Sequence, residues 1–465
     1  MRAPVTTPPS EVRVALLGAG TVGAQVVRLM NERADDLAAR AGAPLRLVGI
    51  AVTDVERERE PWIPRDLLTT DAEGLIADAD VVVELIGGID PPRALVHAAM
   101  AAGATVVTGN KALVAAHGPE LHDAAAAADV DLYYEAAVAG AIPIVYALRE
   151  SLAGDTVTEV LGIVNGTTNY VLDEMATNGS TFDDAVAQAQ ALGFAEADPS
   201  ADVDGHDSAA KAALLASLAF HTRVPLENVP VEGIRGVTVE EMAAAQETGY
   251  ALKLLAVARR TTSPDGISVR VGPTLIPADH PLATVRGAFN AVVVESEAAG
   301  RLMFYGQGAG GAPTASAVLS DLVAAAGHRV RGGQAPRESA YARLAPLPAS
   351  SQRITARFDL EIDDRPGMLA LVAAVLARHG ISIEAVRQAA HTDPTAYGDE
   401  LYDVFDDAYD GGSDRDRDPA ASRESATLTI TTHRTDEGTL AACLAELAGA
   451  DGVRAVLPVR RVEGV

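Results

Sequence analysis

The first 150 residues alternate between short apolar runs and longer segments with apolar residues at helical spacing. Apolar runs of strand type occur at residues 11–17, 45–52, 80–87, 104–109 and 130–138. Between the first two runs, the segment AQVVRLMNERADDLAAR has a helical pattern. Strands that alternate with helices form parallel β-α-β units, and such sheets collect ligands at the carboxyl ends of their strands. The pattern predicts an α/β fold built on a parallel sheet.

The first apolar run leads directly into a glycine-rich turn, GAGTVG (18–23). A strand, a G-x-G-x-x-G turn and a helix form the fingerprint of a Rossmann-type dinucleotide-binding domain. Gly18 would permit the tight turn, Gly20 would let the backbone approach a pyrophosphate, and Gly23 would let helix and strand pack closely. The helix N-terminus attracts the anion. Glycine-rich turns are common, but in this context the motif favours a nucleotide site over a structural turn.

Charged residues after the second strand bear on the choice of nucleotide. Asp54 is placed to bind a ribose hydroxyl, which favours NAD. Arg57 and Arg59 lie close enough along the chain to favour the 2′-phosphate of NADP instead. Ordinary solvated loop charges are an equally good interpretation, so NAD and NADP both stay open.

The pattern changes beyond residue 150. Residues 151–305 contain short β-like stretches around Ala- and Leu-rich helices, which predicts an inserted α+β catalytic domain. Residues 306–345 begin with a Gly-rich turn and a helix, and are expected to return to the nucleotide domain. After a Pro/Ser-containing linker, residues 353–465 show the β-α-β-β-α-β order of a ferredoxin-like module. An acidic run at 391–425 is most simply a solvated, mobile insertion in that module.

Composition narrows the class of protein. The 465 residues carry a net charge of −27, which disfavours binding to nucleic acid or to anionic membrane surfaces. No apolar run approaches the ~20 residues of a membrane span, and the Pro/Thr-rich residues 1–10 read as a disordered tail without a signal core. The single cysteine, Cys443, excludes an internal disulfide. We expect a soluble protein of the cytoplasm.

Lysine is rare in this chain, which has 34 arginines but only Lys111, Lys211 and Lys253. Arginine is effectively always protonated, so a lysine that is retained marks a position where a side chain must gain and lose a proton. The alternative is that base composition drifted toward arginine and these three lysines remain by chance.

A helix expected from Asp207 to Phe220 places Asp207, Lys211, Leu214, Leu215 and Leu218 on one core-facing stripe. An ordinary exposed ion pair between Asp207 and Lys211 is the simpler interpretation of this spacing. Burying two charges is costly without a purpose, however, which favours a role for Lys211 in proton transfer. Lys111 follows a strand at its carboxyl end, where a sheet presents residues to its ligand.

Two further segments carry candidate ligands. Four carboxylates precede the Lys211 helix within nine residues: Glu196, Asp198, Asp202 and Asp204. They would bind calcium or the ammonium group of a substrate. The simpler interpretation is that Asp202 and Asp204 stabilise the start of a helix through its dipole. Residues 135–144 (EAAVAGAIPI) form a small-residue segment whose carbonyls would bind a cation, although a tight packing turn is the simpler interpretation. The histidines show no convincing metal-ligand spacing.

Together these segments resemble the homoserine dehydrogenase family. The resemblance runs in order through ALLGAGTVG, VVTGNKALVA, EAAVAGAIP, GIVNGTTNYVL, GFAEADPSADVDGHDSAAK and FYGQGAGGAPTASAVL. It covers residues 12–345, and the last module resembles an ACT regulatory domain. The family resemblance implies an NAD(P)-dependent, reversible interconversion of L-homoserine and L-aspartate 4-semialdehyde, on the route to threonine, methionine and isoleucine. It also implies a homo-oligomer, a dimer or tetramer, with threonine as a possible allosteric ligand.

The same resemblance assigns roles to individual residues. Lys211 would exchange a proton with the substrate oxygen, and Lys111 would lie between cofactor and substrate. The substrate-binding residues would be Glu196, Asp207 and Asp202. The cofactor-binding residues would be Gly18, Gly20, Thr21, Val22, Gly23, Lys111, Gly193 and Gly308. A monovalent-cation (sodium) site would use Glu135, Val138, Gly140 and Ile142, in part through carbonyl oxygens.

Two other functions compete with this interpretation. One is another Rossmann oxidoreductase of amino-acid-derived alcohols, against which the GFAEADPSADVDGHDSAAK segment argues. The other is a non-catalytic sensor of nucleotide and amino acid, which would have little reason to retain Lys111 and Lys211 in a chain so poor in lysine.

Overall fold

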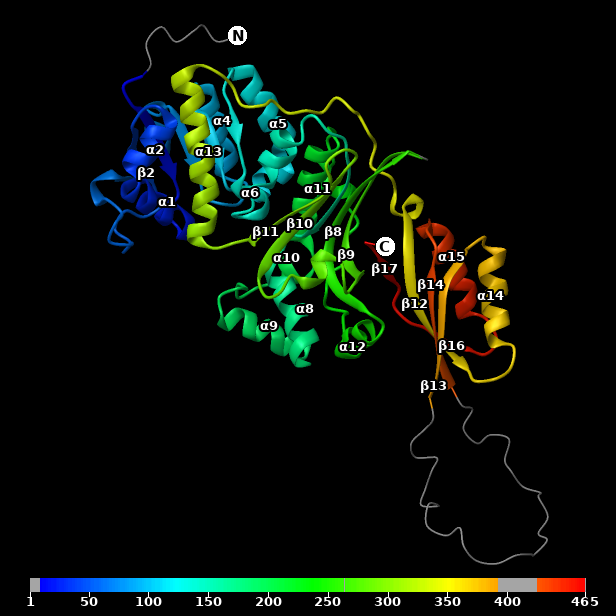
Figure 1. Cartoon of the computed structure of the whole chain (residues 1–465). Helices are drawn as coiled ribbons and strands as arrows, with labels where there is room; N and C mark the ends of the chain where they lie inside the picture. Colours follow the sequence, from blue (N-terminus) through cyan, green and yellow to red (C-terminus); the bar gives the residue numbers. More distant parts are fainter. Residues whose placement is uncertain (1–8, 263, 392–424, 465) are drawn as a thin grey trace, which may run out of the picture. The chain divides into compact units, whose positions relative to one another are not determined.

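The computed structural model describes residues 9–262, 264–391 and 425–464 (Figure 1). The chain divides into two compact units, Met1–Leu347 and Pro348–Val465, which are treated separately below. The expected tail at 1–10 and the expected acidic insertion at 391–425 lie almost wholly outside the described residues.

Unit 1 begins with a six-stranded parallel sheet in the order β3-β2-β1-β4-β5-β6. Its strands are β1 (Val12–Leu17), β2 (Leu45–Ala51), β3 (Leu68–Thr69), β4 (Val81–Glu84), β5 (Thr105–Thr108) and β6 (Leu132–Tyr133). The expected α/β fold of Rossmann type is thereby confirmed. The strand expected over 130–138 is wrong beyond Tyr133, because the alanine-rich segment that follows forms the short helix α6 (Ala136–Ala139) instead.

Helices cover both faces of this sheet. They are α1 (Thr21–Glu32), α2 (Ala34–Ala41), α3 (Ala72–Ala77), α4 (Pro92–Ala101), α5 (Lys111–Ala128) and α13 (Gly311–Arg331), with the 3-10 turn η1 (Arg65–Leu67). The single helix expected after the glycine turn is interrupted at Arg33, whose backbone is not helical. Figure 1 shows α13 in yellow beside α1 and α2 in blue. Gly311 at the start of α13 is 278 residues from Arg33 in sequence. The return segment therefore completes the core of the first sheet.

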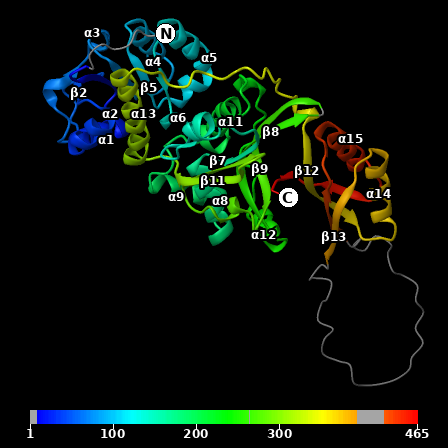
Figure 2. The ribbon, with the colours of Figure 1, turned by 45° about the horizontal axis from the view of Figure 1, so that its top comes forward.

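A second, antiparallel sheet in unit 1 has the order β11-β10-β7-β8-β9 (Figure 2). Its strands are β7 (Val157–Ile163), β8 (Tyr250–Thr262), β9 (Asp265–Pro277), β10 (Phe289–Ser296) and β11 (Gly300–Gln307). The accompanying helical elements are α7 (Ile144–Tyr146), η2 (Ala147–Ser151), α8 (Gly166–Asn178), α9 (Phe182–Ala191), α10 (Ser200–Val203), α11 (His206–Ala219), η3 (Leu226–Asn228), α12 (Val239–Glu247) and η4 (Pro281–Thr284). Helix α11 packs against β7, β8 and β9, and also against α5 of the first sheet. It therefore joins the two halves of unit 1.

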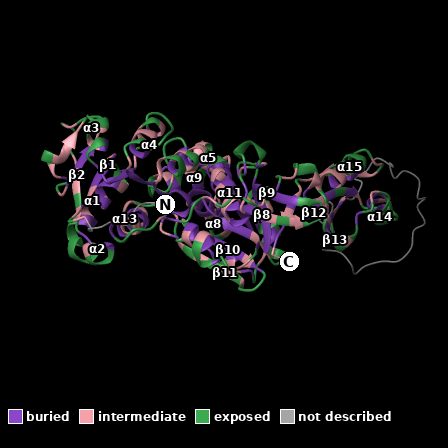
Figure 3. Cartoon of the chain, turned by 90° about the horizontal axis from the view of Figure 1, so that it is seen from above, coloured by how far each residue is buried: buried purple, intermediate pink, exposed green. Residues whose placement is uncertain are grey.

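Unit 2 is the ferredoxin-like module expected from the sequence. Its elements are η5 (Ala349–Ser351), β12 (Arg353–Asp363), α14 (Met368–Arg378), β13 (Ile383–His391), β14 (Ser425–Thr432), β15 (Thr435–Asp436), α15 (Glu437–Ala448), β16 (Val453–Val456) and β17 (Arg460–Val462). The strand β12 is central and pairs with β14 on one side and with β16 and β17 on the other. In Figure 3 the strands β8 and β9 of unit 1 are largely purple, because residues 252–258 and 266–276 are all buried. None of the described helices is both long and apolar enough to cross a membrane.

Candidate active site

A buried ion pair on α11 forms the centre of the site. The Lys211 ammonium lies 2.8 Å from the Asp207 carboxylate, one helical turn away. Lys211 is 7% exposed and Asp207 is 6% exposed. Lys211 also donates a hydrogen bond of 2.7 Å to the carbonyl oxygen of Val164, just beyond the end of β7. The helix therefore holds its only lysine in a fixed position inside the domain.

The expected core-facing stripe of this helix is only partly correct. Asp207, Lys211 and Leu215 are buried, whereas Leu214 and Leu218 are half-buried and line a cavity. The reason is that α11 contacts the sheet on one side and α5 on another, so its apolar surface faces two different environments.

Lys111 joins the pair from the other sheet. It is the first residue of α5, directly after β5, and its ammonium forms an ion pair with the second carboxylate oxygen of Asp207. Its side chain is 51% exposed, in contrast to that of Lys211. The preceding Asn110 caps α5 by accepting a hydrogen bond from the Leu113 amide at 3.1 Å. The structure thus brings both candidate lysines to one carboxylate.

The electrostatics of these groups are strongly coupled. Burial alone would raise the pKa of Asp207, but the Lys211 and Lys111 ammonium groups outweigh burial and hold that pKa well below its usual value. Burial alone would lower the pKa of Lys111, but the carboxylates of Asp207, Asp202 and Glu196 raise it above its usual value. Asp207 is therefore ionised, and the Lys111 amine is protonated at neutral pH.

Asn165 was not among the predicted site residues, yet it organises the carboxylates. Its side-chain amide donates to Asp202 at 2.7 Å and to Asp207 at 2.9 Å, while its carbonyl oxygen accepts from the Thr168 amide as the N-cap of α8. The one available signal was an asparagine between a strand and a helix in VNGTT, which marks an N-cap but does not reveal what the amide contacts.

Glu196 and Gly193 lie in the segment between α9 and α10. Both are exposed, and Gly193 has a positive φ of 76°. Glu196 lies close enough to Lys111 to raise its pKa, so this segment approaches the lysine pair from the solvent side. Asp198 and Asp204 are engaged elsewhere, with Ser200 and Arg235 respectively.

A cleft of about 1180 Å³ borders the glycine turn. Gly18, Gly20 and Thr21 line it. Gly18 has a φ of 99°, and a Cβ on Gly23 would lie 2.2 Å from the Gly18 carbonyl oxygen, so these two positions require glycine. A Cβ on Gly20 would meet no atom within 4 Å, because Gly20 faces the open cleft. Val22 is half-buried in the first turn of α1.

The charged residues after β2 differ in their surroundings. Arg57 and Arg59 line the cleft. Asp54 turns its carboxylate back to accept from the amides of Glu56 and Arg57, at 2.9 and 3.3 Å. Arg59 donates to the carbonyl oxygens of Ala19 and Asp54, which ties this loop to the glycine turn.

Gly140 and Gly308 meet where the two halves of unit 1 join. Gly140 has a φ of 61°, and a Cβ there would lie 2.4 Å from the Gly308 carbonyl oxygen. Glu135, Val138 and Ile142 surround this point and are all buried. The Glu135 carboxylate accepts from the amides of Val145 and Tyr146, both at 2.8 Å. Among the described residues, no group of three or more His, Cys, Asp or Glu side chains is arranged to hold a metal ion.

The third lysine lies apart from this site. Lys253 of β8 is 4% exposed and donates to the Asn169 side-chain oxygen at 2.9 Å and to the Val285 carbonyl oxygen at 2.7 Å. Burial lowers the pKa of Lys253 to about 8. All three lysines therefore occupy special environments, which disfavours random survival.

Comparisons with known proteins agree with this arrangement. Family models match residues 143–323 (homoserine dehydrogenase), 18–135 (homoserine dehydrogenase, NAD binding domain) and 358–408 (ACT domain). The homoserine dehydrogenase of Mycobacterium leprae is 50% identical over 98% of each chain, and that of Corynebacterium glutamicum is 56% identical over 83% of this chain and 88% of its own. The chain belongs to the homoserine dehydrogenase family.

Solved homoserine dehydrogenases also share its fold. The crystal structure of the enzyme from Thiobacillus denitrificans superposes with a TM-score of 0.84 at 37% identity, covering 97% of this chain and 98% of its own. The resemblance seen in the sequence is thus confirmed: the chain is an NAD(P)-dependent oxidoreductase with homoserine dehydrogenase activity and a C-terminal ACT domain. A different Rossmann oxidoreductase and a non-catalytic sensor are no longer competing interpretations.

Proposed function

We propose that Lys211 is the acid–base residue of the interconversion of L-homoserine and L-aspartate 4-semialdehyde, and that Lys111 and Asp207 fix its position and charge. The observation that carries this proposal is the shared ion pair of both lysines with one buried carboxylate. When bound, the nicotinamide nucleotide supplies or accepts the hydride at the substrate carbon. The protein must then supply position and a proton at the substrate oxygen.

The hydrogen bonds of Lys211 leave it one free donor. An ammonium group has three N–H donors, and Lys211 uses one on Val164 and one on Asp207. In the direction of homoserine formation, the third N–H donates to the aldehyde oxygen and its proton passes to the developing alkoxide. In the reverse direction the neutral amine accepts the proton of the hydroxyl group. An arginine could not cycle its proton in this way.

Asp207 is a positioning residue in this arrangement. Its oxygens are occupied by Lys111, Lys211 and Asn165, so little capacity remains for the substrate. Glu196 is exposed beside Lys111 and remains the better partner for the substrate ammonium group, with Asp202 near it. Lys111, half exposed at the end of β5, would contact both nucleotide and substrate.

The steady-state kinetics of two variants test the proposal. Lys211→Arg and Lys211→Met should each lose turnover by about 100-fold or more, since a general acid–base contributes roughly 10²–10⁴-fold. Nucleotide binding, followed by the quenching of protein fluorescence, should be retained. Arg40→Gln, on the exposed face of α2, is the control. Near-normal turnover in Lys211→Arg would exclude the role.

NADP is the nucleotide that the cleft favours. The Asp54 carboxylate is engaged by backbone amides of its own turn, which leaves it poorly placed for a ribose hydroxyl, whereas Arg57 and Arg59 line the cleft. An archaeal homoserine dehydrogenase that is 25% identical over 68% of this chain has been solved in complex with NADPH. Gly18, Gly20, Thr21, Val22, Gly23, Gly193 and Gly308 would supply the remaining contacts.

A sodium ion would be held by backbone carbonyl oxygens near Gly140. The four-residue helix α6 ends there, and the last carbonyls of a helix have no intrahelical partner. The Glu135 carboxylate points to the amides of α7, so residues 135, 138, 140 and 142 would act through their carbonyls. Replacing Na⁺ with tetramethylammonium should lower the melting temperature. An unchanged melting temperature would remove the cation from the proposal.

Threonine would bind to unit 2. A cavity of about 370 Å³ there is lined by Asp364, Arg365, Gly367 and Gln388, which offer both charges that an amino acid requires. Titration of the full-length protein with threonine should reduce the rate of homoserine oxidation. No inhibition by excess threonine would exclude it as the effector.

A homo-oligomer would form through the antiparallel sheet. Phe289 of β10 and Met303 and Tyr305 of β11 are exposed on one face, and the Phe289 and Tyr305 rings stack with centroids 5.1 Å apart. Contiguous exposed apolar side chains mark interaction surfaces.

We assign the protein to the cytoplasm, since its single cysteine, Cys443, is buried and free.

A further inference from the structure

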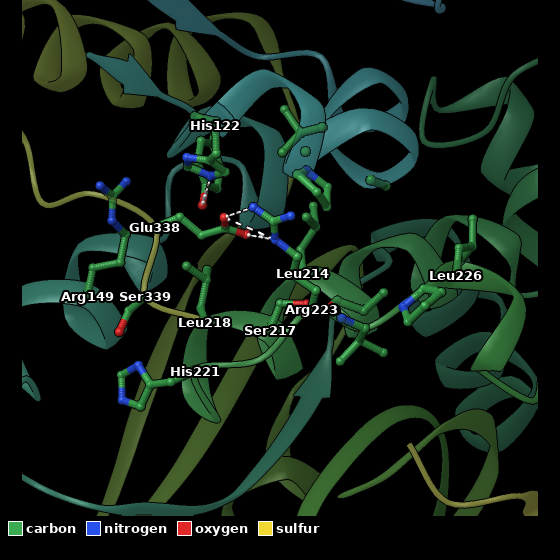
Figure 4. A pocket seen from close by; sticks show the side chains of 18 of the residues that line it. His122, Arg149, Leu214, Ser217, Leu218, His221, Arg223, Leu226, Glu338 and Ser339 are labelled. Carbon is green, nitrogen blue, oxygen red and sulfur yellow. Dashed lines mark hydrogen bonds and ion pairs between the residues drawn. The ribbon is translucent and has the colours of Figure 1, made fainter. Parts of the chain in front are cut away.

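A second large cavity in unit 1 is lined by different residues from the lysine site and the nucleotide cleft. It encloses about 920 Å³, a size typical of sites for small organic ligands. Figure 4 shows its walls, which come from α5, α11 and the segment 334–344 that follows α13. Neither the candidate lysines nor Asp207 line it.

Two helices contribute the apolar walls. Val114 and Gly118 line the cavity from α5, and Leu214 and Leu218 line it from α11. Leu214 and Leu218 are only half-buried, which is unusual for leucines of a helix packed between two sheets. They lie one and two turns beyond Lys211 on the same helix. An apolar body in this cavity would remove them from water.

The segment 334–344, which we call the strap, closes one side of the cavity. Its backbone is tied to the end of α11, because the Ala342 amide donates to the His221 carbonyl oxygen and Thr222 donates to the Leu344 carbonyl oxygen, at 3.0 and 2.9 Å. Glu338 of the strap forms an ion pair of 2.5 Å with Arg223. Figure 4 shows this pair in the middle of the view. The strap is thus a fixed wall.

The charges of the cavity are only partly paired. Three arginines and two glutamates line it. Arg223 is paired with Glu338 and Asp123, and Arg337 is paired with Asp129. Arg149 has no carboxylate within ion-pair distance in the part of the chain that the structure describes. Its guanidinium donates to the Pro336 carbonyl oxygen and lies 5.8 Å from the centre of the Tyr134 ring.

The histidines of the cavity do not change this balance. Burial lowers the pKa of His122 to about 4 and also lowers the pKa of His221, so both rings are neutral at pH 7. The Nδ1 atom of His221 is buried and has no hydrogen-bond partner among the described residues. Among the lining charges, Arg149 and Glu227 have no ion pair in the described part of the chain, so the cavity offers one guanidinium and one carboxylate without a charged partner, one free polar atom and largely apolar walls.

We propose that this cavity binds a small organic monoanion with an aromatic or branched apolar body, held by an ion pair between its anionic group and Arg149. The apolar body lies between α5 and α11. Because the same helices carry Lys111 and Lys211, a ligand that wedges between them changes the distance between the lysines and hence the reaction rate. The site is separate from the effector cavity in unit 2.

Calorimetric titration of the full-length protein tests the proposal with 3-phenylpropionate and its uncharged analogue, 3-phenylpropionamide. We expect the carboxylate to bind at least tenfold more tightly than the amide. Arg149→Gln should abolish this difference, and Arg40→Gln should preserve it. Leu218→Trp fills the cavity and should weaken both probes at least tenfold, and Ala115→Trp is a second filling variant should Leu218→Trp not fold.

Several results would overturn the proposal. Equal affinity for the acid and the amide would show that Arg149 does not recognise an anion. Binding that persists in both folded filling variants would place the probes elsewhere. No binding of either probe would show that the cavity is closed in solution, for example by a second copy of the chain. None of these results depends on the assignment of Lys211.

The rate of homoserine oxidation tests the coupling to the lysines. Saturating 3-phenylpropionate should change kcat at least twofold in the wild type and not in Ala115→Trp. The effect should persist at saturating homoserine and nucleotide. An effect that saturating substrate removes would place the probe in the active site, and binding without any change in kcat would exclude the coupling.

Discussion

The Asp207 carboxylate lies 2.8 Å from the Lys211 ammonium on the same helix, and less than a tenth of either residue is exposed to water. Asp207→Asn keeps the shape of the side chain but removes the charge that both lysines share. We expect kcat/KM for homoserine to fall by about 100-fold, since a buried ammonium without its charged partner is no longer held in position. Steady-state kinetics would measure this loss.

A suitable control for that variant is Asp36→Asn, which removes an exposed carboxylate from α2. Asp36→Asn should keep the wild-type melting temperature, whereas Asp207→Asn should melt at a lower temperature because it leaves the Lys211 ammonium buried without a charged partner, so the kinetics are measured well below that temperature. If Asp207→Asn retained wild-type kcat/KM, the ion pair would have no part in the reaction.

The buried Lys253 should make stability depend on pH. Its folded pKa of about 8 lies below the unfolded value of 10.5, so the unfolded chain binds more protons between these values. The free energy of unfolding should therefore rise with pH from about 8 to 10.5, and this contribution is absent below pH 8, where both states are protonated. Lys253→Met removes the titrating group. Urea unfolding at pH 8, 9 and 10 should show a steeper rise in wild type than in Lys253→Met, and parallel curves would contradict the assignment.

Arg57 should discriminate between the two nucleotides. If its guanidinium contacts the 2′-phosphate, Arg57→Gln should raise KM for NADP by about tenfold, the value of one charge-assisted contact. KM for NAD should change little, because NAD lacks that phosphate. Initial rates with each nucleotide measure the ratio, and an equal effect on both would argue against a phosphate contact.

Gly140 and Gly179 allow a matched test of the joint between the halves of unit 1. Both have a positive φ, 61° and 66°, but only Gly179, with a ψ of 21°, is in the left-handed helical region where alanine costs roughly 1–2 kcal/mol; Gly140, with a ψ of −112°, lies outside that region and tolerates alanine less well. A Cβ at 140 would also meet the Gly308 carbonyl oxygen at 2.4 Å, whereas one at 179 meets no atom within 4 Å. Gly140→Ala should therefore be clearly less stable than Gly179→Ala in urea unfolding. Equal losses would mean that the Gly308 loop moves freely.

The exposed aromatic pair of the antiparallel sheet should support assembly. Tyr305→Asp places a charge beside Phe289 and should shift the protein toward monomer in sedimentation velocity. Tyr341→Asp changes a tyrosine elsewhere that is more exposed than Tyr305, 73% against 55%, and should leave the sedimentation unchanged. If both variants sediment as wild type, the interface lies on another surface.

Local patterns were sufficient for α11 and for five of the six strands of the first sheet; the two-residue strand β3 was not predicted. Strands such as β4 are continuous apolar runs, and helix α11 follows from its apolar spacing, so both could be predicted from the sequence. The helix α6 was mistaken for part of a strand because Ala136, Ala137 and Val138 are all apolar, and so short a run fits either conformation. Short apolar runs do not distinguish helix from strand.

Contacts between distant segments limited the prediction of the site. The approach of Asn165 to Asp207 spans 42 residues, and no local signal specifies it. For the same reason Leu214 and Leu218 were expected in the core, since their spacing does not reveal that a cavity rather than a strand lies opposite them. Lys111 and Lys211 could be predicted as site residues because the chain has 34 arginines and only three lysines, so the positions that keep a lysine stand out.

The unequal exposure of the three lysines has a practical consequence. Lys211 and Lys253 are enclosed, and only Lys111 has half of its side chain open to solvent. Of the three lysine side chains, that of Lys111 is therefore the most accessible to amine-directed acylating reagents, and because its raised pKa keeps the amine protonated, modification should be slow until the pH is made alkaline. Acylation removes the positive charge that pairs with Asp207, so the native protein carries an amine whose chemical modification would silence it at a single point.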